Sequence, residues 1–389
     1  MGIFSPAEMR RRLTAFDAAL EERHINVALV HTADNVYYFS GVPLLSEWGR
    51  PMWVVVDPSA GSSIVGASIE TENMAAYSAI SRVISYADDE RSVDACLHHV
   101  MSAVGGMRDA AIRFGIERSA MTLALYEALR ASLPKATFVD VGEIIAGLRL
   151  IKSAEEIEIL ELGGTVAKIG ANAFLQALTD NVPELTVAGY AVAEMDRALA
   201  ALSPGGATST YAYAQFGEHT LTPHLHPTGK RLRRGDLVAL NVFPTIWGYC
   251  VELERTFVFG AATAEQQSAL DAVNEAFDAG KEAVRPGVSM GEIDVLTRRM
   301  LEKRNYGAYI RHGAGHAHGI MIGAASREEG GELRAYNAGR LQPNMANSVE
   351  PGVYVPNLGG FRHSDVLIVT DNGARCITEF PRDIAYARA

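Results

Sequence analysis

The stretch N-V-F-P-T-I-W-G-Y-C-V-E-L-E-R-T-F, residues 241–257, decides how the rest of the chain is interpreted. It predicts two apolar strands joined by a tight turn at its Pro and Gly residues. Glu252 and Glu254 lie two positions apart on the second strand, a spacing that directs both carboxylates to one face of a sheet. A strand this apolar is expected to be buried, and buried Glu is rare unless it is paired or used. The stretch therefore predicts a negatively charged site inside a sheet.

Length, composition and charge exclude several classes of function. The chain has 389 residues, of which 48% are hydrophobic, and its formal net charge is -11. That size allows a large core and either two domains or one large one. The acidic balance argues against nucleic acid or an anionic membrane as a partner, because no basic patch offsets it.

The cysteines and the N-terminus favour a cytoplasmic protein. Cys96, Cys250 and Cys376 are far apart and show no metal-site spacing, as expected in a reducing compartment. No apolar run is long enough to cross a membrane, and the N-terminal M-G-I-F-S-P lacks the residue order of a signal peptide. We therefore expect a cytoplasmic location.

Alternating helix and strand signals in the first 150 residues predict an α/β domain. Ser5-Pro6-Ala7-Glu8 is a capping box with Pro at the first helical position, and its helix is expected to end near Glu22. The remaining elements expected in this domain are strands at residues 27–30, 53–57, 64–66, 82–86, 112–115 and 138–141, and helices at residues 93–104 and 122–133.

A second capping box, at Ser153 and Glu156, begins a long helix that is expected to end near Leu178. We therefore expect two domains, residues 1–150 and 151–389. Helices and antiparallel strands alternate in the second one, which predicts an α+β domain with a curved antiparallel sheet covered by helices. Its other expected elements are helices at 187–202, 264–284 and 290–305 and strands at 210–216, 237–243, 248–259, 346–355 and 364–377, the last with a D-N-G hairpin turn.

Five motifs, taken in order, resemble the creatinase/prolidase/methionine-aminopeptidase superfamily, whose catalytic domain has the "pita-bread" fold. Each motif is weak alone, but their order and spacing together are specific. The resemblance covers nearly the whole chain. The motifs are L-R-L-I-K-S-A-E-E-I (148–157), G-D-L-V-A-L-N (235–241), G-H-x-x-G (315–319), E-P-G-V-Y (350–354) and G-F-R-x-x-D (360–365).

Metal-dependent members of that superfamily bind two ions with two Asp, one His and two Glu. The matching positions here are Asn241, Glu252, His316, Glu350 and Ser364. Asn is a weak neutral ligand and Ser is rarely one, whereas a dinuclear site needs anionic oxygen donors. We therefore expect a metal-independent protein with no cofactor. The alternative is that Glu252, His316 and Glu350 still hold one ion.

The non-metal branch of the superfamily, creatinase, is the most similar in the central strand pair. Its pattern N-x-F-P-x-I-x-G-Y-x-x-x-L-E-R-T matches residues 241–256. The resemblance implies hydrolysis of creatine to sarcosine and urea, or of a close analogue. It assigns catalysis to His224, as general base and then acid, and binding of the guanidinium to Glu254 and Glu350. Forked carboxylates suit a planar guanidinium, and one His of near-neutral pKa can move both protons.

The resemblance also implies how the substrate carboxylate is bound. Arg327 and Arg50 match two arginines that bind the substrate carboxylate, and Arg is the residue best suited to pair with a carboxylate. In that family the second Arg reaches the site from the partner subunit, so a homodimer is implied. The remaining residues expected to contact the substrate are His316, Glu252, Cys250, His363 and Trp48.

Departures from the family pattern leave the substrate open. Creatinase has Tyr in place of Cys250, a small residue in place of Glu252, and Glu-His in place of His363-Ser364. Another substrate with a carboxylate and a cationic guanidinium or amidine head fits as well as creatine. The alternatives are a cyclic-amidine (ectoine-type) hydrolase, an X-Pro metallopeptidase of the same fold, and a binding protein that lost turnover. His226 and His318 are expected to be structural or to support other residues.

Overall fold

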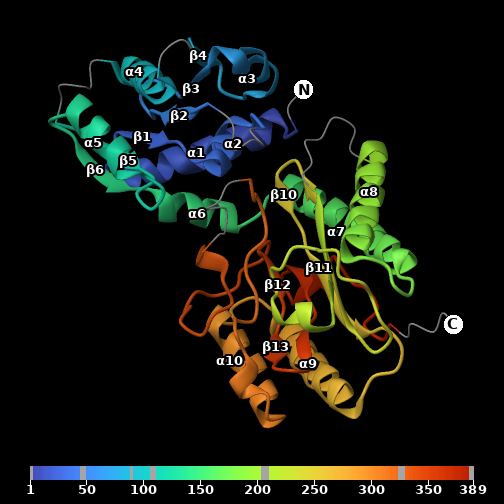
Figure 1. Cartoon of the computed structure of the whole chain (residues 1–389). Coiled ribbons are helices and arrows are strands. Elements are labelled where there is room, and N and C mark those ends of the chain that lie inside the picture. Colours follow the sequence, from blue (N-terminus) through green and yellow to red (C-terminus); the bar gives the residue numbers. More distant parts are fainter. Residues whose placement is uncertain are drawn as a thin grey trace. The chain divides into compact units, whose positions relative to one another are not determined.

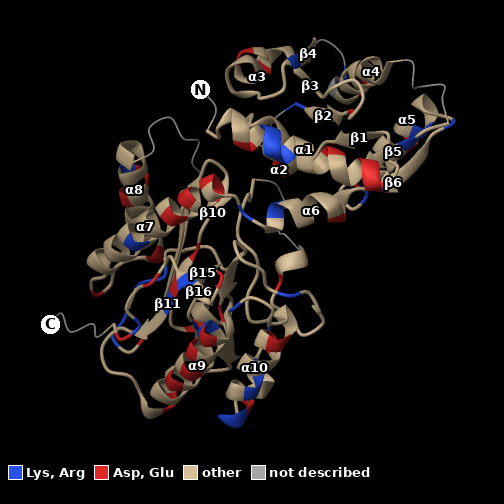
Figure 2. Cartoon of the chain, turned by 180° about the vertical axis from the view of Figure 1, so that it is seen from behind, with Lys and Arg blue, Asp and Glu red and all other residues tan. Residues whose placement is uncertain are grey.

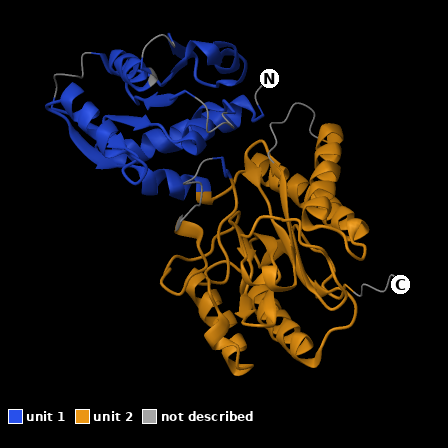
Figure 3. Ribbon diagram, viewed as in Figure 1, with its two compact units in different colours: residues 1–149, 320–326 blue, residues 150–319, 327–389 orange. Residues whose placement is uncertain are grey.

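The computed structural model describes residues 3–43, 50–87, 91–105, 111–202, 210–322 and 329–384. Trp48 and Arg327, two of the expected substrate-binding residues, lie outside the described residues. The chain divides into two compact units, unit 1 with residues 1–149 and 320–326 and unit 2 with residues 150–319 and 327–389 (Figure 3). The division into domains 1–150 and 151–389 stays a prediction, since compact units are defined by contacts alone.

Unit 1 contains a six-stranded mixed sheet in the order β4-β3-β2-β1-β5-β6 (Figure 1). The central strand β1 pairs antiparallel with β2 and parallel with β5. The Oγ atom of Ser5 accepts a hydrogen bond from the Glu8 amide and caps the first helix, as expected. The strands are β1 Val27–Val30, β2 Trp53–Val56, β3 Ser63–Ala67, β4 Arg82–Tyr86, β5 Arg113–Ile116 and β6 Thr137–Asp140. The helices are α1 Pro6–Glu22, α2 Ala33–Ser40, α3 Thr71–Tyr77, α4 Ser92–Val104, α5 Leu123–Ser132 and α6 Gly142–Leu150.

Unit 2 consists of antiparallel strand groups, β7-β8-β11, β9-β10, β12-β15-β16 and β13-β14. A bridge between Glu254 and Ser364 joins β11 to the start of β15, so the groups continue into one another as a curved sheet. The strands are β7 Tyr211–Phe216, β8 Leu237–Phe243, β9 Thr245–Ile246, β10 Tyr249–Cys250, β11 Leu253–Val258, β12 Ala346–Val349, β13 Gly352–Val355, β14 Gly359–Arg362, β15 Asp365–Val369 and β16 Ala374–Cys376.

Three helices of unit 2, α7 Ala154–Ala177, α8 Glu184–Leu202 and α9 Ala264–Ala283, pack on these strands, and a fourth, α10 Met290–Lys303, packs on α9. Their buried apolar faces form the cores with the sheet. Figure 2 shows the opposite, acidic face of α9. Two helices followed by antiparallel strands thus occur twice in the chain. The expected fold class is confirmed: an α/β unit followed by a curved antiparallel sheet covered by helices, the pita-bread architecture.

The tight turn inside the central stretch forms as expected. Trp247 and Gly248 both have positive φ, 50° and 78°, which is the backbone of a type I′ hairpin turn between β9 and β10. No helix in the described part of the chain combines the length and the apolar character needed to span a membrane.

Two strands that were expected to be continuous are each divided in two. A Glu residue of the expected site lies in each gap. The strand expected at 248–259 divides into β10 and β11, with Glu252 in the gap. The strand expected at 346–355 divides into β12 and β13 at Glu350-Pro351, because Pro cannot donate a hydrogen bond to a strand ladder.

A buried ion pair holds β11 against β15. The Arg255 guanidinium donates to the carbonyl oxygens of Glu254 and Ser364, at 2.8 and 2.9 Å, and pairs with Asp365 at 2.8 Å. Both side chains of that pair are 1% exposed. Lys281 pairs with the second Asp365 oxygen at 2.7 Å. Arg255 therefore ties down a carboxylate and two carbonyls and fixes the backbone of Glu254.

Replacing Asp365 with Asn should lower the free energy of unfolding by about 3–5 kcal/mol, because it leaves the buried Arg255 charge without its anionic partner. Urea unfolding followed by circular dichroism measures the change. Arg304→Ala is the control: it breaks a pair with Glu275 whose side chains are 39% and 49% exposed, and should cost less than about 1 kcal/mol. Equal losses in the two variants would contradict this account.

Candidate functional site

Three buried carboxylates converge in unit 2. Oxygen atoms of Glu252, Glu254 and Glu350 all lie within 4.8 Å of one another, and the three residues are only 2–6% exposed. Glu252 and Glu254 point the same way because they are two positions apart in extended backbone, as the sequence predicted. Glu350 comes from the opposite strand group, in the gap between β12 and β13. Three carboxyl groups buried this close can all be ionised only if positive charge lies beside them.

Arg362, the last residue of β14, supplies part of that charge. Its guanidinium pairs with Oε1 of Glu254 and donates to the Asn241 side-chain oxygen at 3.4 Å. Burial raises the pKa of Glu254 to about 8; Arg362 opposes the rise, and the neighbouring Glu252 and Glu350 add to it. The second oxygen of Glu254, Oε2, is buried with no hydrogen-bond partner among the described residues. It is therefore available to a donor or cation from outside the chain.

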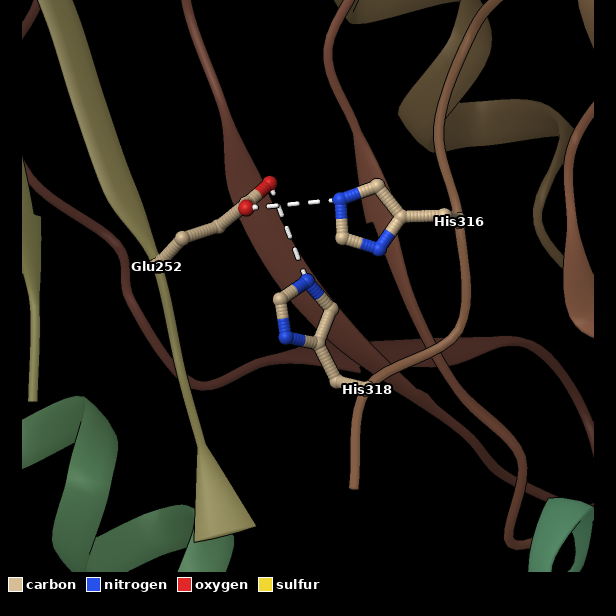
Figure 4. Close-up of side chains that lie close together, drawn as sticks. All are labelled: Glu252, His316 and His318. Carbon is tan, nitrogen blue, oxygen red and sulfur yellow. Dashed lines mark ion pairs between the residues drawn. The ribbon is translucent and has the colours of Figure 1, made fainter. Parts of the chain in front are cut away.

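Glu252 faces two imidazoles. Its Oε2 atom lies 3.5 Å from Nε2 of His316 and its Oε1 atom 3.7 Å from Nε2 of His318 (Figure 4). Nε2 of His316 is also 3.8 Å from Oε1 of Glu350. The Ser364 hydroxyl donates to Oε1 of Glu252 at 2.6 Å. Burial alone would raise the pKa of Glu252, but the two imidazoles hold it well below its usual range.

The backbone of Gly315–Gly319 explains why both imidazoles face the carboxylate. This segment is extended and pairs with its neighbours through bridges at Gly315 and Ala317, so residues 316 and 318 project to the same side. The carbonyl oxygen of Ser348 comes so close that a Cβ on Gly315 would lie 2.0 Å from it. Only Gly allows that approach.

The residues present do not fit a dinuclear metal centre. Asn241 and Ser364, at two of the five expected ligand positions, are neutral and already engaged. The Asn241 amide donates to the Tyr213 carbonyl at 3.2 Å and its oxygen accepts from Arg362, while Ser364 donates to Glu252. The donor atoms of Glu252, His316 and His318 lie within 4.8 Å of one another and do fit a single ion.

His224, expected to be the catalytic base, lies on the loop after the 3₁₀ segment Gly217–Leu221, and its side chain is exposed. The Gln215 amide on β7 fixes this loop by donating to the carbonyls of Thr222, Pro223 and Leu225, at 2.9, 3.1 and 2.9 Å. His226, on the same loop, packs edge-on against Tyr213, consistent with its expected structural role.

Among the described residues of unit 2, Cys250 and His363 make no hydrogen bond or ion pair with the three carboxylates. Cys250 is buried and its carbonyl accepts from His318; burial raises the pKa of its thiol to about 12, so the thiol stays neutral. His363 packs against Phe277 of α9, and among the described residues it makes no hydrogen bond or ion pair with the three carboxylates. Burial and then Arg255 hold the pKa of His363 well below its usual range. Arg50, in unit 1, is exposed.

Two residues of the site were missed by reasoning from sequence. Arg362 was part of a motif but received no role, and nothing local marks it as the partner of Glu254. His318 was expected to be structural. The two-residue spacing to His316 was the available signal, since it is the same argument that placed Glu252 and Glu254 on one face.

Comparison with known proteins identifies the family. Residues 159–371 match the model of metallopeptidase family M24, and residues 12–151 match the creatinase/prolidase N-terminal domain. The chain belongs to family M24. Its fold and its two matched domains are those of a hydrolase of the creatinase/M24 family, which includes creatinase as well as peptidases.

Relatives that match nearly the whole chain include a protein named creatinase and a protein named Xaa-Pro dipeptidase. A protein named creatinase, from a Bacillus species, is 31% identical over 97% of this chain and 92% of its own length. An Xaa-Pro dipeptidase of Pyrococcus furiosus is 27% identical over 97% of this chain and 100% of its own. The crystal structure of the prolidase from Pyrococcus horikoshii superposes with a TM-score of 0.82 at 25% identity, covering 96% of this chain and 99% of that one.

The raised pKa of Glu254 predicts a dependence of stability on pH. The unfolded chain ionises this group near pH 4.5 and the folded chain only near pH 8, so the free energy of unfolding should fall as the pH rises between these values. Glu254→Gln should reduce that fall, which urea unfolding at a series of pH values measures. Glu158→Gln, at an exposed position of α7, is the matched control and should behave like wild type. A Glu254→Gln profile identical to wild type would contradict the raised pKa.

Proposed function

We propose that this chain hydrolyses a carbon–nitrogen bond, outside a peptide, in a small acid with a cationic guanidinium or amidine head. The head binds between Glu254 and Glu350. The observation that carries the proposal is the buried Oε2 atom of Glu254, which has no partner in the described part of the chain while two further carboxylates lie within 4.8 Å. A planar cation with several N–H donors satisfies such a set.

The neutral residues beside the carboxylates support an organic cation over a pair of metal ions. Asn241 and Ser364 remove two anionic donors from the dinuclear ligand set, and Arg362 already places a guanidinium on Glu254. The contact of Arg362 with Glu254 illustrates the kind of pairing that a substrate guanidinium would make with the remaining oxygen. Creatinase among the relatives supports the same class of substrate.

The other roles follow the resemblance. His224 is the general base that activates water and then the acid that protonates the leaving nitrogen. Arg327 and Arg50 bind the substrate carboxylate, and Arg50 is supplied by the second subunit of a homodimer. Trp48, Cys250, His363, Glu252 and His316 complete the pocket in this proposal.

A second candidate is an Xaa-Pro dipeptidase that uses metal. The relatives of this chain support it at least as well, since peptidase and dipeptidase names outnumber creatinase among four of them. Glu252 and His316 would then be metal ligands. Asn241 and Ser364 count against this candidate, because they leave the dinuclear centre with too few anionic donors.

A mass-spectrometric screen separates these candidates. The purified chain is incubated with creatine and other guanidino acids, with cyclic amidines of the ectoine type, and with X-Pro dipeptides. Release of urea supports the main proposal, and ring opening without urea indicates a cyclic-amidine hydrolase. Release of proline from dipeptides, with no turnover of the other two classes, would overturn the proposal in favour of the second candidate. No turnover of any class would favour a binding protein.

Replacing His224 with Ala should lower kcat by about 10²–10⁴-fold on the substrate that the screen identifies, because the general base is lost. His226→Ala, two residues away on the same exposed loop, is the matched control and should stay near wild type. Steady-state kinetics with both variants measures the effect. If the two histidine variants lose activity equally, His224 has no special role and the loop alone matters.

A subunit-mixing experiment tests the dimeric site. Arg50→Ala and His224→Ala homodimers should each be nearly inactive, whereas mixed dimers carry one site with both residues intact. Activity should therefore return after subunit exchange, followed by native mass spectrometry. No recovery despite proven exchange would show that Arg50 does not act across the interface.

A further inference from the structure

A buried carboxylate lies at the base of the loop that carries His224. This loop, residues 217–227, is termed the His224 loop; it leaves β7 after Phe216 and returns to the start of α8 at Thr228. Glu184, the first residue of α8, is 0% exposed and contacts both ends of the loop. Its carboxylate is out of water and takes its hydrogen bonds from the protein.

Each oxygen of Glu184 holds one end of the loop. Oε1 accepts hydrogen bonds from the amide of Phe216 and from Nδ1 of His219, both at 2.9 Å. Oε2 accepts hydrogen bonds from the amide and the hydroxyl of Thr228, at 2.9 and 2.7 Å. Hydrogen bonds to a carboxylate are roughly twice as strong as those between neutral groups. One side chain thus draws the two ends of the His224 loop together.

Neighbouring contacts do not replace this connection. The backbone bonds from Leu185 to the Thr228 carbonyl, at 3.1 Å, and from Glu184 to the Lys230 carbonyl, at 2.9 Å, fix the returning end alone. Lys230 also pairs with Glu218 near the start of the loop, at 2.5 Å, but the Glu218 side chain is 70% exposed. Exposed ion pairs of this kind contribute little to stability.

The His224 loop is also fixed beside the acidic cluster. Oγ1 of Thr220 accepts a hydrogen bond at 2.8 Å from the amide of Gly360, which lies on β14 two residues before Arg362. A Cβ on Gly360 would lie 2.0 Å from the Thr220 carbonyl oxygen, so only Gly allows this approach. The loop therefore stands against the strand that contributes Arg362, and its closure at Glu184 limits where the segment bearing His224 can lie.

We propose that Glu184 is a positioning residue: by closing the base of the His224 loop, its carboxylate determines where the His224 imidazole lies relative to the acidic cluster. The inference rests on the proposed function, in which His224 moves the protons. A displacement of a reacting group by about 1 Å can cost about 10²-fold in rate. Glu254 and Glu350, which bind the substrate head in that proposal, come from other segments. Loss of the connection should therefore lower kcat and leave KM nearly unchanged.

Glu184→Gln removes the connection with little change in shape. Gln has the same length but one acceptor oxygen instead of two, so the amide of either Phe216 or Thr228 is left facing an NH₂ group. We expect kcat to fall about 10–100-fold and KM to stay within about twofold of wild type. Steady-state kinetics on the substrate that the screen identifies measures both values.

Glu117→Gln is the matched control. Glu117, in unit 1, is 2% exposed and accepts hydrogen bonds from a similar set of donors: the amides of His31 and Thr32, at 2.5 and 2.9 Å, and the Thr32 hydroxyl. It also lies 3.0 Å from Nδ1 of His31. Both Gln variants should lower the melting temperature, because each leaves a buried donor unpaired. Only Glu184→Gln should lower kcat, and equal losses of kcat in the two variants would overturn the proposal.

A double variant shows whether Glu184 acts through His224. In the His224→Ala protein, Glu184→Gln should lower kcat by less than about twofold, because the group that Glu184 positions is already absent. Losses that multiply would mean that Glu184 contributes by another route, which contradicts the proposal.

Thr228→Val serves if Glu184→Gln folds poorly. It keeps the shape of the side chain and removes the hydroxyl that donates to Glu184. It should lower kcat by less than Glu184→Gln does, and Thr228→Ser, which retains the hydroxyl, should stay near wild type. Equal activity of Thr228→Val and Thr228→Ser would count against the connection.

Hydrogen exchange followed by mass spectrometry measures the loop without any substrate. Amides of residues 217–227 should exchange at least about tenfold faster in Glu184→Gln than in wild type, whereas those of β11 should keep their rates. Glu117→Gln should leave residues 217–227 unchanged. Unchanged exchange of the loop in Glu184→Gln would overturn the proposal, whatever the protein hydrolyses. Faster exchange in a chain that turns over none of the screened substrates would support the role of Glu184 in closing the loop and refute the proposed function instead.

Discussion

The stability of unit 2 depends on how it balances the charge of three carboxylates that are buried within 4.8 Å of one another. Glu254 relies on Arg362, and burial still raises its pKa to about 8. Glu252 faces two imidazoles and a serine hydroxyl. Unpaired charge out of water is costly, so the arrangement is stable only with cationic partners, and some of those partners are left for a ligand to provide.

The scaffold keeps these charges together by joining distant segments. Arg255 ties the carbonyls of Glu254 and Ser364 and the carboxylate of Asp365 into one buried network. A backbone bridge between Glu254 and Ser364 reinforces the same junction. Glu252 and Glu350 lie in interruptions between strands, whereas Glu254 is the second residue of β11 and pairs with Asn241 of β8.

The same geometry explains why a family name alone leaves the chemistry open. The chain belongs to family M24, and its relatives carry both creatinase and dipeptidase names. Neutral Asn241 and Ser364 remove the basis for a dinuclear centre, whereas the buried Oε2 atom of Glu254 has no hydrogen-bond partner among the described residues.

The sequence by itself determined the longer helices, a tight turn in the central stretch and the shared direction of Glu252 and Glu254, because capping, turn residues and two-residue alternation act between near neighbours. It also indicated the fold class and most residues of the acidic cluster through ordered motifs. Only the tertiary structure decided that Arg362 pairs with Glu254, that His318 faces Glu252, and that His363 packs against Phe277. These contacts join segments far apart in the chain, and their partners are chosen by how the strands of the curved sheet come together, which no local pattern specifies.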